Sequence, residues 1–347
     1  MKKLIGWLLR LLGICAAIAL LCWTVSSTGA NPYEALKGAD PWLLLAAFAC
    51  VGSTHLIGGY RWGRLLAVQG VEMSFLLLYQ LTLAGTFFSQ VIPGSVSGDV
   101  VKLAIVARRH PGKGTAAVMS CLIDRVAGVS GLFLVASLCG GLFWLMRPEI
   151  VAAETVLQTA LLLVFLGGAA FLCMLAVMVY HGLLLKIGWL KRFVEVLGRF
   201  CPKIISDLVV RLCTAADAYS RHKRVLVEVL ALSMLIHFML GVGVFCTGRA
   251  LGETRRSFGA YIISMQVGNA VTLVPATPGG LGMRESMTAA MFTAFGREAR
   301  GQEDTRQDEG KDGLAGSIPV VNTLCTIAWA LIGAVALGTL PKRQASS

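Results

Sequence analysis

The sequence predicts an all-α integral membrane protein, a polytopic helical bundle with about six full spans and two re-entrant hairpins in an inverted repeat. Three observations predict this class. Of the 347 residues, 56% are hydrophobic and only 14% are charged. Apolar runs of about 20 residues, the length that crosses a bilayer, recur along the chain. Two further apolar segments are broken by Pro and Gly at corresponding places in the two halves.

The two broken segments match each other in sequence. When Pro93 is aligned with Pro275, Lys102 falls on Arg284, so each break is followed by a basic residue. Pro and Gly end helices, and a charge is costly inside a bilayer. Broken hydrophobic segments at matching places in two halves are typical of a transporter binding site. The alternative is that two ordinary loops share Pro-Gly by chance.

The expected spans follow the apolar runs in order. They cover residues 4–25, 41–59, 116–146, 156–180, 225–247 and 318–340, with hairpins at 74–107 and 258–296. The first run is interpreted as a retained helix and not a signal peptide, because it is long and no cleavage site follows. We expect a single transmembrane domain over residues 1–347. Its predicted parts are a first repeat at 41–146, a connecting region at 147–224 and a second repeat at 225–340.

The distribution of basic residues predicts the orientation. Lys and Arg concentrate in the loops that lie inside when both termini are cytoplasmic, as the positive-inside rule requires. The first hairpin then enters from the cytoplasm and the second from outside. Tyr60 to Arg64 combine aromatic and basic residues, which predicts that the second span ends at a cytoplasmic interface. The Lys- and Arg-rich segment 186–224 is either an amphipathic surface helix on anionic lipid or a solvated loop.

Composition also excludes several classes of function. The net charge is +12. The basic residues that cause it lie mainly in loops beside the membrane, so we expect them to contact the membrane surface and expect no nucleic-acid partner. The ten Cys are scattered without a Cys-x-x-Cys motif, and the five His do not cluster. This pattern indicates free thiols, no metal site and no cofactor. We therefore do not expect an enzyme.

Six ionisable residues lie within the apolar segments: Asp99, Lys102, Asp124, Arg125, Arg284 and Glu285. Each costs about 3 kcal/mol or more at the bilayer centre unless it is paired or hydrated. In one hypothesis they form ion pairs that hold the hairpins, either Asp99 with Lys102 or Asp124 with Arg284. In the other hypothesis they surround a hydrated cavity between the hairpins.

The second hypothesis assigns a substrate site. Lys102 and Arg284 would attract an anion such as a phosphate head group. Helices that start just after Gly98 and Gly282 would add free backbone N–H groups and a positive dipole end, with Gly280 in the same break. The carboxylates Asp99, Asp124 and Glu285 would bind a cationic part of the substrate or carry protons. Together with Arg125 they are assigned to coupling or charge pairing.

The chain resembles a known family at these residues. The motifs are Arg61-Trp62 with Leu65-Leu66, Phe87-Phe88 through Pro93 to Gly98-Asp99, Asp124-Arg125 with Gly128, and Pro278-Gly279-Gly280-Leu281-Gly282 with Arg284-Glu285. They resemble the transmembrane region of lysylphosphatidylglycerol synthases, a flippase-like membrane family. The resemblance implies a protein of a bacterial or archaeal cytoplasmic membrane that moves lipids between leaflets or binds them, and we expect the bacterial cytoplasmic (inner) membrane. The chain departs from the family pattern at Ser97, where Gly is frequent, and at Lys102, where Arg is frequent.

Together these observations predict translocation of an anionic lipid: a phospholipid, an aminoacyl-phospholipid or a polyprenyl-phosphate. Some members of the family carry a soluble aminoacyltransferase domain in addition to the membrane region. We find no such domain in residues 1–347, so synthase activity is not expected. A second hypothesis is a non-catalytic partner of a lipid-modifying synthase or glycosyltransferase, docked through segment 186–224. A third is an enzyme that acts on lipid head groups. Carboxylates for it exist, but no Ser/His/Asp or metal constellation accompanies them.

Overall fold

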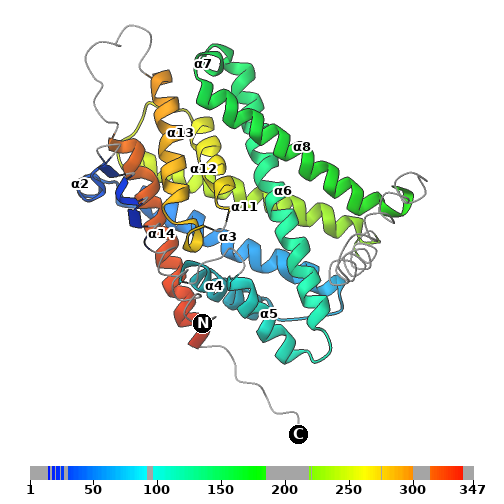
Figure 1. Cartoon of the computed structure of the whole chain (residues 1–347). Helices are drawn as coiled ribbons and strands as arrows, with labels where there is room; N and C mark the ends of the chain where they lie inside the picture. The colour runs from blue at the N-terminus through cyan, green and yellow to red at the C-terminus, as the bar shows by residue number, and fades with distance from the viewer. Residues whose placement is uncertain are drawn as a thin grey trace, which may run out of the picture.

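The computed structural model describes residues 30–91, 97–184, 219, 221–274, 276–299 and 313–338, with a few positions between 15 and 26. Outside the described residues lie most of the predicted first span, both aligned prolines, most of segment 186–224 and the loop 300–312. The described elements are helices (Figure 1). They are α2 (Pro32–Lys37), α3 (Pro41–Val68), α4 (Phe75–Val91), α5 (Ser97–Arg109), α6 (Gly114–Met146), α7 (Pro148–Ala153), α8 (Thr155–Leu184), α11 (Lys223–Ala250), α12 (Phe258–Val271), the 3-10 turn η1 (Pro278–Gly280), α13 (Met283–Ala299) and α14 (Gly313–Gly338).

Five of these helices, α3, α6, α8, α11 and α14, are long and apolar enough to cross a membrane. They contain 26 to 33 residues. A rise of about 1.5 Å per residue makes each longer than a hydrocarbon core of about 30 Å, so they tilt or project beyond it. The predicted all-α polytopic membrane class is confirmed, while the exact span count stays a prediction.

The two broken segments form pairs of shorter helices. In the first pair α4 packs on α5, and in the second α12 packs on α13. These four helices contain 13 to 17 residues. A single span usually needs about 20 residues, so each of them is shorter than a typical span. This is the geometry that a re-entrant hairpin requires; the side from which each hairpin enters stays a prediction.

The two predicted halves pack on each other reciprocally. Helices α3 and α11, the first long helix of each half, lie alongside each other through the middle of the bundle (Figure 1). The first hairpin packs through α4 on α14, and the second packs through α12 on α6. Each hairpin therefore contacts the last long helix of the opposite half. An inverted repeat would produce this pattern, and the repeat itself stays a prediction.

The second predicted span is longer in the structure. Asp40 caps the start of α3, where its carboxylate accepts the N–H of Trp42 at 2.8 Å. The helix continues nine residues beyond the predicted end at 59, to Val68. Within the predicted interface at Tyr60 to Arg64, Arg61 and Trp62 are 9% and 1% exposed, so they pack inside the bundle, and the depth of this segment in the membrane stays a prediction. Arg61 donates to Asp124 of α6 and Ser233 of α11, and Trp62 donates to Ser120 of α6.

Large apolar side chains remain exposed on the outside of the bundle. Trp42 is 76% exposed, Leu145 84% and Val335 70%. Such exposure would be a liability in water, but lipid tails solvate these side chains well. The polar residues instead collect inside, where the helices enclose the site.

Candidate functional site

A cavity of about 410 Å³ lies among α3, α4, α5, α6, α11 and α12. This volume falls within the range of about 300–1,000 Å³ that is usual for small-ligand sites. Both hairpins contribute to it. The first supplies residues of α4 and α5, and the second supplies Asn269 and Thr272 with Gly279 of η1. Ionised side chains of α3, α5 and α6 complete the wall: Arg61, Asp99, Lys102, Asp124 and Arg125.

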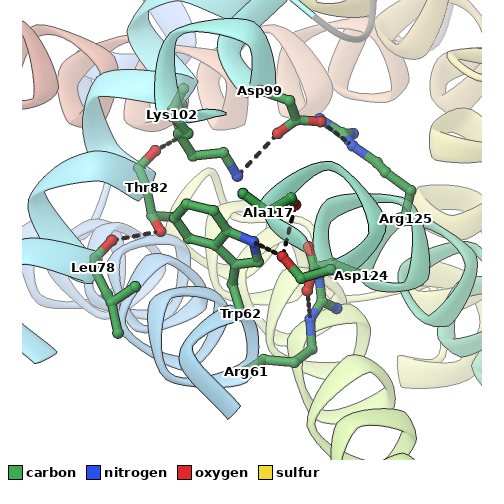
Figure 2. A network of polar contacts seen from close by, with 11 residues as sticks. Arg61, Trp62, Leu78, Thr82, Asp99, Lys102, Ala117, Asp124 and Arg125 are labelled. Atoms are coloured by element: carbon green, nitrogen blue, oxygen red, sulfur yellow. Dashed lines mark hydrogen bonds and ion pairs between the residues drawn. The ribbon is translucent and has the colours of Figure 1, made fainter. Parts of the chain in front are cut away.

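Asp99 connects two of the cationic groups (Figure 2). It lies in the first turn of α5 and is 2% exposed. Lys102, three residues later on the same helix face, donates to it at 2.9 Å, and Arg125 of α6 donates to it at 2.5 Å. The Lys102 ammonium also lies 4.8 Å from the centre of the Trp62 ring. The predicted ion pair of Asp99 with Lys102 is therefore present.

Asp124 pairs with a residue that the sequence analysis did not assign to the site. Its two carboxylate oxygens accept from Arg61 Nε at 2.7 Å and from Arg61 Nη2 at 2.9 Å. The same guanidinium donates to Ser233 Oγ at 2.8 Å. Arg61 thereby joins α3 to α6 and α11. The alternative pairing of Asp124 with Arg284 is wrong, because α3 and not the second hairpin supplies the partner of Asp124.

The ionised residues of the cavity carry a net positive charge. Three cationic side chains face two carboxylates, which gives a formal charge of +1. Arg125 is the most accessible of the three cations, with a side chain 49% exposed, whereas the Lys102 side chain is 11% exposed. A positive excess inside a low-dielectric bundle concentrates field lines and attracts anions.

Three polar atoms of cavity residues are buried and have no hydrogen-bond partner within the described part of the chain. They are His55 Nε2, Gln90 Oε1 and Asn269 Nδ2. Most buried polar groups in proteins are hydrogen-bonded, and an unsatisfied group costs about 1–3 kcal/mol. These atoms have almost no accessible surface, so a polar occupant would reach them only if the wall rearranged. Hydroxyl and amide side chains line the cavity as well, so it offers both positive charge and neutral hydrogen-bonding groups.

The second basic residue of the aligned pair lies elsewhere. Arg284 donates to Glu285 at 2.8 Å and to Thr323 Oγ1 of α14 at 3.1 Å. Glu285, fully buried, also accepts from the Thr323 hydroxyl and from the Gly282 N–H at 2.6 Å. The N–H of Gly282 itself is therefore not free, because the Glu285 carboxylate accepts from it, while free N–H groups at the start of α13 stay a prediction. None of Gly280, Gly282, Arg284 and Glu285 lines the cavity, so the geometry does not bring Arg284 to the same anion as Lys102.

Two predicted glycines have structural reasons to be glycine. Gly280 has φ +72°, a left-handed conformation that favours glycine, and a Cβ there would lie 2.4 Å from Thr272 Cγ2. Gly98 is buried where α5 meets α4, and a Cβ there would lie 2.0 Å from the Gly85 carbonyl oxygen. Neither residue lines the cavity. Their expected role as phosphate-binding N–H groups stays a prediction.

Arg61 and His237 are site residues that were not predicted from the sequence. Arg61 contributed only to the family resemblance, because it was placed at an interface beyond the end of a span. The signal for it was the apolar run that continues past it to Val68. His237 lies alone within the apolar run of α11, and only its contacts with α6 and α12 reveal it.

Comparison with known proteins agrees with this architecture. A family model described as the lysylphosphatidylglycerol synthase TM region matches residues 7–300, which include both hairpins and every residue of the cavity. A UPF0104 membrane protein of Methanothermobacter thermautotrophicus is 23% identical over 279 residues, which are 76% of this chain and 77% of the relative. No solved structure matches the chain. The chain belongs to the family of the lysylphosphatidylglycerol synthase transmembrane region.

Proposed function

We propose that the protein translocates an anionic lipid between the two leaflets of the bacterial cytoplasmic membrane, with both of its termini on the cytoplasmic side. Membership of the family gives the chain a membrane role related to lipids. The observation that carries the proposal is the cavity, which collects a formal charge of +1 inside an otherwise apolar bundle. The lipid tails remain among the exposed apolar side chains while the head group crosses through the cavity.

The contacts at Asp99 suggest how the head group binds. Arg125 and Lys102 both donate to this carboxylate, so an incoming phosphate competes with it for the same donors. Arg125 offers a planar fork that fits phosphate in a bidentate manner, whereas Lys102 acts as a point charge. The hydroxyl and amide groups of the wall, among them Gln90 and Asn269, bind the rest of the head group. Phospholipids, aminoacyl-phospholipids and polyprenyl-phosphates all present such a phosphate.

The two other predicted functions gain no support from the described residues. The partner hypothesis depends on segment 186–224, most of which lies outside them. The enzyme hypothesis requires a nucleophile or a metal beside the carboxylates. Among the described side chains of the cavity, Asp99 and Asp124 are instead engaged by Lys102, Arg125 and Arg61.

The test is to identify the lipids that copurify with the protein. The double variant Lys102→Met/Arg125→Met is expected to lose the enriched anionic lipid by about tenfold or more, because each charge-assisted hydrogen bond contributes about 1.5–3 kcal/mol. Lipid content is measured by mass spectrometry, and translocation is measured in proteoliposomes.

Two further variants make this test specific. Arg64→Met removes an arginine that pairs with Glu228 outside the cavity, and it is the matched control for loss of a positive charge. Arg284→Met tests the predicted second phosphate ligand, and we expect it to retain the lipid if the protein still folds. Equal lipid content in Lys102→Met/Arg125→Met and in Arg64→Met would contradict the site. Loss of the anionic lipid from a folded Arg284→Met variant would show that Arg284 belongs to the lipid-binding site.

A further inference from the structure

His237 on α11 bridges two other helices at the wall of the cavity. Its Nδ1 lies 2.9 Å from Oε1 of Gln266 on α12. Its Nε2 lies 3.1 Å from the backbone carbonyl oxygen of Gly128 on α6. Both of these oxygens accept hydrogen bonds and neither donates. The ring therefore faces an acceptor on each of its two nitrogens.

The orientation of the Gln266 amide follows from its second contact. Gln266 is fully buried, and its Nε2 donates to the backbone carbonyl oxygen of His237 at 2.8 Å. If the amide were turned over, its Oε1 would face that carbonyl oxygen, and two acceptors would oppose each other. The carbonyl therefore fixes Oε1 against the histidine ring.

The two acceptors determine which form of the ring fits. A neutral imidazole has one N–H donor and one acceptor nitrogen, whereas the doubly protonated ring has two donors. Only the doubly protonated ring of His237 satisfies Gln266 Oε1 and the Gly128 carbonyl together. A neutral ring keeps one of these contacts and presents a lone pair to the other oxygen. Protonation therefore lets the ring bond to both α6 and α12, and loss of the proton removes one of these two ring hydrogen bonds, while Gln266 Nε2 still donates to the His237 carbonyl oxygen.

Charged groups around the ring relate this proton to the ligand. From α3, Arg61 lies beside Gly128, whose Cβ position would be 3.7 Å from the guanidinium, and His55 lines the same cavity. The remaining ionised groups that line this cavity are Asp124 and Arg125 on α6 and Asp99 and Lys102 on α5. The titratable residue of α12 is Tyr261, which donates to Glu253.

A proton on His237 would raise the formal charge of the cavity from +1 to +2. Burial of an additional unpaired charge in a low-dielectric interior is costly. An anionic head group in the cavity offsets that charge. The anion therefore favours the protonated ring, and by linkage the protonated ring favours binding of the anion by the same factor.

We infer that His237 is a proton-binding site whose protonation is coupled to occupation of the cavity by an anionic head group. This inference depends on the proposed function for the nature of the ligand. The lipid and the proton enter together, and the loaded ring fixes the second hairpin, through α12, to α6 and α11. Release of the lipid and the proton frees one of these contacts. Translocation then draws on the proton gradient.

The test observes the ring directly in the full-length protein. The probe is nanodiscs of phosphatidylcholine with or without phosphatidylglycerol, and solid-state NMR of isotope-labelled histidine reports the protonation of the ring nitrogens. The His237→Asn variant identifies the signal. We expect phosphatidylglycerol to raise the ratio of protonated to neutral His237 by about tenfold, within the usual range of coupling between two sites. The same protonation state in both lipid compositions would overturn the inference.

Two controls separate this coupling from the negative surface of the nanodisc. Surface charge attracts protons to every accessible histidine, including His110 in the turn after α5, whereas coupling acts on His237 alone. Lys102→Met removes the cation that would hold the anion but leaves the membrane charge unchanged. The response of His237 is expected to be lost in that variant. An equal response of His110, or a response of His237 that persists in Lys102→Met, would overturn the inference.

Transport measurements keep this inference distinct from the proposed function. In proteoliposomes with fluorescent phosphatidylglycerol, an imposed proton gradient is expected to accelerate translocation by the unaltered protein and to have no effect on His237→Asn. If the rate of translocation does not depend on the proton gradient and His237 stays neutral, the inference is wrong and the proposed function remains supported. A coupled protonation without any lipid movement would support the proton site and count against translocation.

Discussion

Replacement of Arg61 by methionine is expected to lower the free energy of unfolding by about 3–5 kcal/mol, because it leaves the Asp124 carboxylate buried without its counter-charge. The two side chains of this pair are 10% and 11% exposed, and the guanidinium contacts both carboxylate oxygens. Asp124→Leu is expected to cost a similar amount by leaving Arg61 unpaired. Thermal and denaturant unfolding of the purified protein in detergent would measure both.

The double variant Arg61→Met/Asp124→Leu distinguishes the contribution of the intact ion pair from the cost of leaving one charge buried alone. Well-packed apolar residues often replace a buried ion pair at little cost, so we expect the double variant to recover most of the stability. The control is Arg64→Met, which breaks the more exposed pair with Glu228, whose side chains are 42% and 31% exposed. That pair is expected to contribute at most about 1 kcal/mol. If Arg61→Met and Arg64→Met lower the free energy of unfolding by the same amount, the buried pair does not hold α3 against α6.

The Arg61 result also bears on function, because the residue joins three helices beside the cavity. If Arg61 and Asp124 serve only the fold, the double variant regains lipid binding together with stability. If Arg61 contributes charge to the head-group site, the double variant is stable but binds less anionic lipid. Lipid analysis of the folded double variant distinguishes these roles, which stability alone does not.

The sequence predicted the parts of this fold that depend on local composition. Apolar runs of spanning length located α6, α8, α11 and α14 to within a few residues. Pro and Gly located the breaks between α4 and α5 and between α12 and α13, because these residues end helices wherever they fall. The ion pair of Asp99 with Lys102 could also be predicted from the sequence, since residues three apart share one face of a helix.

Contacts between helices could not be predicted in the same way. Arg61 and Asp124 are 63 positions apart, and nothing local to either residue identifies the other. The pairing follows from which faces of α3 and α6 meet, which is a property of the packed bundle. The same holds for His237, whose two acceptors come from Gly128 and Gln266 on different helices. An isolated histidine in an apolar run carries no such information.

Glycines within the hairpins show a related difference. The sequence assigned Gly98 to substrate binding because it lies at a helix start next to a charged residue. In the structure its missing side chain allows α5 to approach α4, where a Cβ would lie 2.0 Å from the Gly85 carbonyl oxygen and 2.5 Å from Ser89 Oγ. A close helix approach leaves no signal in a single sequence that separates it from a ligand-binding glycine. The two roles differ in the result of one substitution.

Gly98→Ala is expected to destabilise the first hairpin by about 1–3 kcal/mol, because the obstructing atom is backbone and no flexible side chain can move aside. Alanine retains the backbone N–H. If Gly98 acted only as an N–H donor to a phosphate, the substitution would leave both stability and lipid binding unchanged. If the glycine is required for packing, α5 must shift away from α4. The shift would displace the adjacent Asp99 from Arg125, and anionic lipid would be lost from the purified protein together with stability.

The matched control is Gly141→Ala in α6, where the added Cβ would lie 3.9 Å from the Phe165 ring, an ordinary contact. Alanine is a better helix former than glycine by about 1 kcal/mol, so this variant is expected to be neutral or slightly stabilised. Unfolding midpoints and lipid content of the two variants are compared in the same detergent. Native stability of Gly98→Ala with its lipid retained would contradict the packing role and leave Gly98 as an N–H donor to the substrate. Loss of both properties in Gly98→Ala alone would show that the glycine positions the charged cluster by letting two helices touch.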